Sequence, residues 1–171
     1  DICKAMIETG IAPDFITIDG AEGGTGAAPL EYTDYVGMPL MDALAFVSES
    51  LAKFGLRDQI KIMASGKIIT GFDIMKALAL GADACYSARG MMMALGCIQA
   101  LKCDSGKCPV GIATQDKSLF KEIDVTDKKH RVPNFHKNTI HATVELMEAC
   151  GFTTPEHINP ESFHRRIDTT K

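Results

Sequence analysis

The chain has 171 residues, of which 46% are hydrophobic and 23% are charged. This composition is typical of a folded globular domain and excludes a disordered chain, and the length is sufficient for one hydrophobic core. The formal net charge of -4 argues against nucleic acid and membrane surfaces as partners, because both require a basic patch.

The sequence carries no sign of membrane insertion or secretion. No apolar run approaches the roughly 20 residues that a transmembrane helix needs, and no signal peptide precedes the first predicted helix. Six cysteines are too few for a disulfide scaffold in a chain of this size, so we expect reduced thiols and a cytoplasmic protein. The chain begins at Asp1 with a helical pattern and no preceding strand, and we therefore expect it to be part of a longer protein.

Strand-like and helical patterns alternate along the first hundred residues. Short apolar runs predict strands over 14–19, 59–64 and 82–87, the first of them buried. Helical spacing of apolar residues predicts helices over 2–8, 40–54, 71–80 and from Gly90 to about Lys102, the last with Ile98 and Leu101 facing inward. This alternation predicts an α/β fold with a parallel sheet, which is either a small three-layer unit or part of a (β/α)8 TIM-type barrel.

The rest of the chain is predicted to be helical after a turn-rich segment. We expect a short helical turn over 117–122, an exposed charged segment over 124–131, an amphipathic helix over 134–149 and a last helical piece over 155–166.

Two loops are candidate anion sites. The segment from Ser65 to Thr70 follows the second predicted strand and leads into a helix, and the segment from Ser87 to Gly90 does the same after the third, adding the cation of Arg89. Free N–H groups at helix N-termini bind anions. Each loop alone is also consistent with an ordinary connection, but the pair favours a phosphate. The glycine-rich loop over 20–29 would let backbone N–H groups approach a ligand closely, but it lacks the ending of a P-loop. A ligand-binding loop and a plain turn are equally consistent with this segment.

Cys97, Cys103 and Cys108 fall within twelve residues, and Pro109 follows the last of them. Their sulfur atoms can converge if the preceding helix ends near Lys102 and the turn-forming residues after it fold back. The spacing fits structural zinc poorly, whereas a compact cysteine run followed by proline is common among iron–sulfur ligands. An iron–sulfur cluster is the favoured interpretation, either a three-iron cluster or a four-iron cluster with a labile or non-cysteine ligand. Another metal, redox thiols and unligated thiols are the alternatives.

Three stretches, 19–29, 64–73 and 94–116, resemble the FMN-binding, glutamate-synthase-like family, and the cysteine stretch is the most specific of them. The tail over 130–166 looks like the shorter, single-module branch of that family. The resemblance implies that residues 1–171 are the C-terminal part of an FMN-binding glutamate synthase domain. Its three strands would be about the sixth to eighth of a (β/α)8 barrel, followed by the cysteine loop over 97–108 and a helical tail over 116–171.

The resemblance also implies two cofactor sites. The FMN phosphate would lie among residues of the two strand-to-helix loops, and the flavin ring and substrate near the glycine-rich loop. Cys97, Cys103 and Cys108 would hold a three-iron, four-sulfur (3Fe-4S) cluster. The implied FMN-binding residues are Ser65, Gly66, Lys67, Gly71, Ala88 and Arg89 at the phosphate, and Gly23, Gly24 and Gly26 at the ring.

The implied reaction is the oxidoreductase step of glutamate biosynthesis. A donor, either ferredoxin or a reductase subunit, would pass electrons through the cluster to the flavoprotein's FMN, which would reduce 2-iminoglutarate, formed from 2-oxoglutarate and ammonia, to glutamate. This chain supplies no N-terminal cysteine like that of the family's glutaminase, and the resemblance makes a glutaminase partner one source of the ammonia.

We expect a partial barrel with open strand edges to be inactive alone and to form a homo-oligomer. Two other interpretations stay open. The chain could be an iron–sulfur electron-transfer or subunit-docking module without flavin, or a redox-silent α/β unit with buried thiols.

Overall fold

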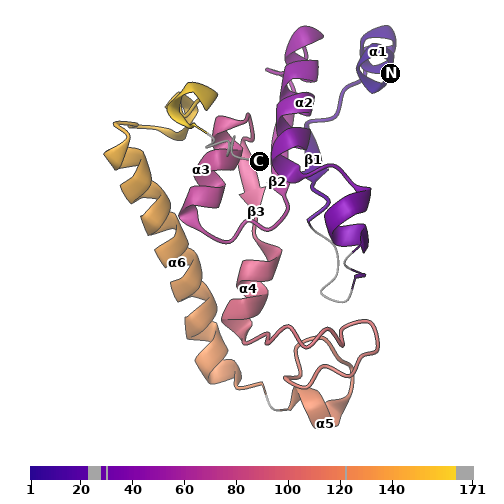
Figure 1. Ribbon diagram of the computed structural model, residues 1–171, viewed down its shortest axis with the longest axis vertical. Coiled ribbons are helices and arrows are strands. Elements are labelled where there is room, and N and C mark those ends of the chain that lie inside the picture. Colours follow the sequence, from indigo (N-terminus) through magenta and orange to yellow (C-terminus); the bar gives the residue numbers. More distant parts are fainter. Residues whose placement is uncertain (23–27, 30, 122, 165–171) are drawn as a thin grey trace, which may run out of the picture.

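Three parallel strands from the first half of the chain form one sheet (Figure 1). The computed structural model describes residues 1–22, 28–29, 31–121 and 123–164, so Gly23, Gly24 and Gly26 lie outside the described residues. The strands are β1 (Phe15–Asp19), β2 (Lys61–Ser65) and β3 (Ala84–Tyr86), in sequence order across the sheet. The predicted mixed α/β fold with a parallel sheet is confirmed.

Helices follow the strands in the predicted alternation. The helix α1 precedes β1 and has no buried residue, and the five-residue π-helix η1 leads into α2. The elements are α1 (Ile2–Thr9), η1 (Tyr32–Val36), α2 (Leu40–Lys53), α3 (Gly71–Ala79), α4 (Ala88–Leu95), α5 (Lys117–Phe120) and α6 (Val125–Ala149), with the 3-10 turns η2 (Pro155–His157) and η3 (Pro160–Ser162). Among the described residues, no helix combines the length and the apolar character needed to cross a membrane.

The core lies between the sheet and its covering helices. Leu44 and Leu51 of α2 pack in one buried cluster with Ile62 of β2, and Ile18 of β1 packs against it. Side chains alternate between the two faces of a strand, so Phe15 points to the opposite face, where it is 54% exposed. The prediction that the first strand is buried is therefore wrong, because the described residues cover only one of its faces.

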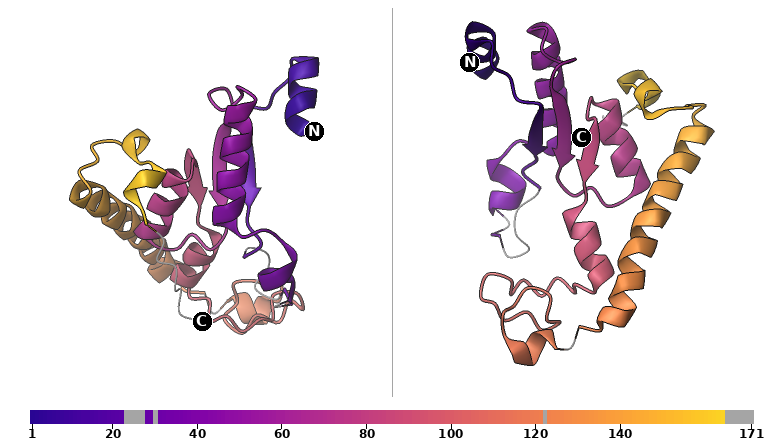
Figure 2. Two further views of the ribbon diagram at one scale, coloured as in Figure 1. Left: turned by 45° about the horizontal axis from the view of Figure 1, so that its top comes forward. Right: turned by 180° about the vertical axis from the view of Figure 1, so that it is seen from behind.

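The long helix α6 packs across α3 and α4 (Figure 2). Met147 of α6 is buried with Met75 and Ala79 of α3. The chain then turns back over α3, where Ile158 joins the same cluster and the ring of Phe163 lies 6.0 Å from that of Phe72. This second cluster fixes the position of α3 from the side away from β1.

Two helix boundaries differ from the predictions. The helix α4 ends at Leu95, because Gly96 adopts a left-handed φ of 109°, and Ile98 and Leu101 are 64% and 57% exposed instead of facing inward. The helix α6 begins at Val125 and includes Pro133, so most of the charged segment over 124–131 is helical. Asp124 caps this start by accepting hydrogen bonds from the backbone N–H groups of residues 126 and 127.

The predicted terminal helical piece is two 3-10 turns, η2 and η3, in its described part.

Candidate functional site

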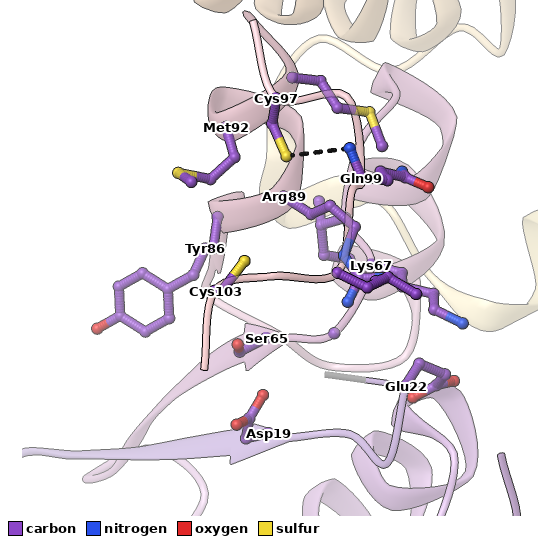
Figure 3. A pocket seen from close by; sticks show the side chains of 15 residues that line it. Asp19, Glu22, Ser65, Lys67, Tyr86, Arg89, Met92, Cys97, Gln99 and Cys103 are labelled. Carbon is purple, nitrogen blue, oxygen red and sulfur yellow. Dashed lines mark hydrogen bonds between the residues drawn. The ribbon is translucent and has the colours of Figure 1, made fainter. Parts of the chain in front are cut away.

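A pocket of about 390 Å³ opens at the carboxyl ends of the three strands (Figure 3). Asp19, Ser65 and Tyr86 are the last residues of β1, β2 and β3, and all three line the pocket. They are also direct partners in the sheet, since Asp19 pairs with Ser65 and Ser65 with Tyr86. The carboxyl ends of parallel strands are where α/β proteins bind their ligands.

Five of the six residues predicted to surround a phosphate lie together on this pocket. They come from the loop after β2 and from the loop and first turn after β3, and they are Ser65, Gly66, Lys67, Ala88 and Arg89. The two loops are tied to each other, because the Ser87 hydroxyl donates a hydrogen bond of 2.7 Å to the carbonyl oxygen of Ile68. The pocket therefore has a wall with two cations, Lys67 and Arg89.

The structure places Gly71 apart from this group. Gly71 does not line the pocket but is buried beneath α6. The first turn of α3 is already capped, because Thr70 Oγ1 accepts from the Asp73 N–H at 3.2 Å and Asp73 Oδ2 accepts from the Thr70 N–H at 2.9 Å. Burial opposes ionisation of Asp73, but hydrogen bonds from Lys76 and Thr70 outweigh it and lower the pKa of that carboxyl.

The chain leaving β1 forms the opposite wall of the pocket. The Gly20 N–H donates to the Ser65 carbonyl oxygen at 2.7 Å, which extends the β1–β2 ladder by one bond. Both carboxylate oxygens of Glu22 then accept from the backbone N–H of Leu40, at 3.1 and 2.9 Å, at the start of α2. This wall carries two carboxylates, Asp19 and Glu22.

Asp19 and Glu22 are not among the functional residues predicted from the sequence. The signal that could have found Asp19 was its place at the end of a predicted strand, immediately before the glycine-rich loop.

Two of the three clustered cysteines face this same pocket. Cys97 and Cys103 line it, and in Figure 3 both lie on the side of the pocket opposite Asp19. Cys97 directly follows Gly96 and is therefore outside α4, contrary to the prediction that the helix carries it. Its sulfur accepts a hydrogen bond of 3.4 Å from the Gln99 N–H.

Cys108 is buried within a turn of backbone N–H groups. Hydrogen bonds from Ala113 and, more weakly, from residues 110–112 lower the pKa of the Cys108 thiol against the opposing effect of burial. Successive N–H groups of this kind stabilise an anion, here a thiolate. Gly111 makes the turn possible, because it has a φ of +74° and a Cβ atom there would lie 2.5 Å from the carbonyl oxygen of Leu119.

All six cysteines are free thiols. Within the described ranges, no three His, Cys, Asp or Glu side chains lie close enough to hold a single metal ion. An iron–sulfur cluster makes a different demand, because its thiolates bind different iron atoms and stand farther apart. The donor chemistry of the segment fits such a cluster, with three reduced cysteines, one of them held in a turn that favours the thiolate.

Comparison with known proteins identifies relatives over nearly the whole chain. The chain is 49% identical over 161 residues to the glutamate synthase large subunit-like protein YerD of Bacillus subtilis (strain 168), a match that covers 94% of this chain and 31% of that protein. It is 44% identical over 155 residues to the archaeal glutamate synthase (NADPH) of Methanocaldococcus jannaschii, covering 89% of this chain and 30% of that protein.

A more distant relative is the glutamate synthase (NADPH) large chain of Bacillus subtilis. The two are 37% identical over 141 residues, a match that covers 82% of this chain and 9% of that protein. The chain thus spans less than a third of the length of these relatives. The family described as the conserved region in glutamate synthase matches residues 2–153. Because this match includes all three strands, the pocket and the cysteine segment, the chain belongs to the glutamate synthase family defined by that conserved region.

Proposed function

We propose that this chain is part of an FMN and iron–sulfur oxidoreductase of the glutamate synthase type. The whole protein would reduce 2-iminoglutarate, formed from 2-oxoglutarate and ammonia, to glutamate. The observation that supports this proposal is the shared pocket, because the two loops suited to a phosphate and two of the three clustered cysteines line the same cavity.

The loops after β2 and β3 fit the phosphate of FMN. Lys67 and Arg89 supply positive charge, and the backbone at Gly66, with a φ of 149°, adopts a conformation that L side chains rarely reach. A Cβ atom there would also lie 3.2 Å from the Leu40 side chain. When bound, FMN supplies hydride transfer to the substrate. Gly71 would then support this site from below, by allowing α6 to pack against α3. Gly23, Gly24 and Gly26 stay proposed residues of the flavin-ring site.

Cys97, Cys103 and Cys108 would hold a 3Fe-4S cluster, which supplies one-electron transfer from a donor protein. The chain would contribute backbone hydrogen bonds that hold two of these sulfur atoms in place. The turn after Cys108 donates backbone N–H groups to its sulfur, and the Gln99 N–H donates to the sulfur of Cys97. Hydrogen bonds to cluster sulfurs also tune the reduction potential.

The three strands would be the last three of a (β/α)8 barrel completed by other parts of the protein. Phe15 lies on the face of the sheet away from α2 and α3 and is exposed there. In a complete barrel that face would line the interior, so the proposal accounts for this exposure. We further propose that ferredoxin or a reductase subunit is the electron donor, that a glutaminase delivers ammonia, and that the protein is a cytoplasmic homo-oligomer.

Anaerobic purification of the full-length protein tests the cofactor assignment. We expect an absorbance spectrum with flavin bands together with protein-bound iron and sulfide. A cluster without flavin would instead favour the electron-transfer or docking module, and a colourless protein would overturn both.

A further inference from the structure

The pocket divides its charges between two walls. Lys67 belongs to the loop after β2 and Arg89 to the first turn of α4, whereas Asp19 ends β1 and Glu22 follows it. Figure 3 shows Lys67 and Arg89 on one side and the carboxylate of Asp19 extending into the pocket from the end of its strand. A ligand with anionic and cationic ends would find both partners in this one cavity.

The two carboxylates differ in what they already bind. Both oxygens of Glu22 accept from the Leu40 N–H, so this carboxylate holds the start of α2. The Asp19 carboxylate forms no hydrogen bond or ion pair with any other described residue. It is exposed on the open face of the sheet, where the strand register sets it beside Ser65. Adjacent strands lie about 4.8 Å apart, so the Ser65 hydroxyl shares the level of Asp19 in the pocket.

We propose that Asp19 is the ammonium-binding residue of this pocket and that it pairs with the nitrogen of the substrate while that nitrogen is positively charged. This assignment rests on the proposed function, in which ammonia and 2-oxoglutarate combine in the same cavity. The phosphate of FMN requires cations, and Lys67 and Arg89 on the pocket's other wall provide them. The nitrogen is the one reactant group that needs an anion, and Asp19 is the carboxylate not already engaged by the described chain.

Tyr86 and Ser65 serve a different purpose in this arrangement. Ser65 is the strand partner of Asp19 on β2, and Tyr86 is the partner of Ser65 on β3. They can donate to or accept from the substrate but cannot neutralise a cation. Charge recognition of the nitrogen therefore belongs to Asp19.

The test is the ammonium dependence of the full-length protein carrying Asp19→Asn. The substitution keeps the size of the side chain and removes its charge. We expect the KM for ammonium in 2-oxoglutarate-dependent flavin reoxidation to rise by about tenfold, the effect of losing one charged hydrogen bond. The FMN content and the KM for 2-oxoglutarate should stay close to the wild-type values, and Asp19→Glu should retain most of the ammonium affinity.

A binding measurement without turnover gives a second readout. Ammonium chloride is titrated into the oxidised protein saturated with 2-oxoglutarate, and the flavin difference spectrum is followed; the Asp19→Asn variant should require about tenfold more ammonium. Asp14→Asn is the matched control, because Asp14 precedes the other end of β1 and does not line the pocket. Unchanged ammonium affinity in Asp19→Asn, beside an active wild type, overturns this assignment alone. A wild type without 2-oxoglutarate-dependent reoxidation overturns the proposed function as well.

Discussion

Gly71, the first residue of α3, lies directly against Thr143 in α6. A Cβ atom at position 71 would come 2.7 Å from the Thr143 backbone nitrogen and 2.9 Å from its Oγ1. Thr143 is itself buried, and its hydroxyl is already bonded to the Thr139 carbonyl oxygen at 2.8 Å. The contact therefore involves backbone and a fixed side chain, neither of which can move aside easily.

Gly71→Ala should destabilise the protein by about 1–3 kcal/mol through overpacking of this contact. Helix propensity alone predicts the opposite, because alanine is favoured over glycine in a helix. The free energy of unfolding from urea denaturation checks the expectation. A variant as stable as the wild type, or more stable, would show that α6 does not pack on α3 as described.

Asp83 joins the starts of β2 and β3 to the chain after α2. Its Oδ2 accepts from Arg57 Nη2 and from the Ile62 N–H, each at 2.8 Å, and its Oδ1 accepts from Lys61 Nζ at 3.1 Å. Asp83→Asn should cost about 1–3 kcal/mol in the free energy of unfolding, because it weakens a partly buried charged network. Asp58→Asn, an exposed neighbour, is the control and should change stability little.

The same network makes stability depend on acid pH. Burial opposes ionisation of Asp83, but the Ile62 N–H, Lys61 and Arg57 outweigh it and hold the pKa of the carboxyl below its ordinary 3.8. A lowered folded-state pKa adds stability that is complete above the ordinary pKa and is lost as the pH falls through the folded-state pKa. The wild type should therefore have a higher free energy of unfolding than Asp83→Asn at neutral pH, and denaturation curves should show this difference shrinking as the pH falls below about 3.8. If the two proteins still differ by the same free energy of unfolding at low pH, the stabilisation does not come from the charge of Asp83.

Two glycines of the cysteine segment allow a matched comparison. Gly111 and Gly106 both have positive φ, +74° and +67°, but a Cβ atom at 111 would meet the Leu119 carbonyl oxygen at 2.5 Å whereas 106 has nothing within 4 Å. Gly106→Ala should cost about 1–2 kcal/mol from left-handed backbone strain alone. Gly111→Ala should cost more and should also lower the iron content, because it displaces the turn that donates to Cys108. Equal iron loss in both variants would count against a role for that turn.

The order of strands and helices could be predicted because the spacing of apolar residues is a local signal. The grouping of the two loops at one edge also followed, since parallel strands end on the same side. The path between α4 and Cys103 could not be predicted in the same way. Apolar spacing continues through Ile98, yet Gly96 turns left-handed and so do Gln99 and Leu101, with φ values of 55° and 52°.

Left-handed backbone at ordinary residues costs about 1–2 kcal/mol each, so contacts elsewhere must impose it. Gln99 and Leu101 both line the pocket, where stored strain of this kind is common. The packing of Gly71 beneath α6 was equally hidden, because it joins residues 72 positions apart in the sequence. Glycine at position 71 is consistent both with a phosphate contact and with close packing against α6, and the sequence alone does not distinguish these two roles.

Lys67 gives a direct test of the FMN site. Lys67→Met keeps the aliphatic stem and removes the charge, and we expect FMN to bind about tenfold more weakly, the effect of losing one charged hydrogen bond. Fluorescence of the flavin released on dilution measures the change. Lys53→Met, at the exposed end of α2, is the control and should leave FMN affinity unchanged. Equal FMN affinity in the two variants would remove Lys67 from the site.

The most direct measurement is the anaerobic reoxidation of the reduced full-length protein, followed by flavin absorbance with glutamate assayed in the same sample. We expect reoxidation that requires both 2-oxoglutarate and ammonium and yields glutamate. We also expect Cys103→Ser, which loses iron, to block reduction by ferredoxin or a reductase, whereas Cys150→Ser, at the exposed end of α6, should not. Flavin reoxidation that ignores 2-oxoglutarate, or full iron content in Cys103→Ser, would contradict these expectations.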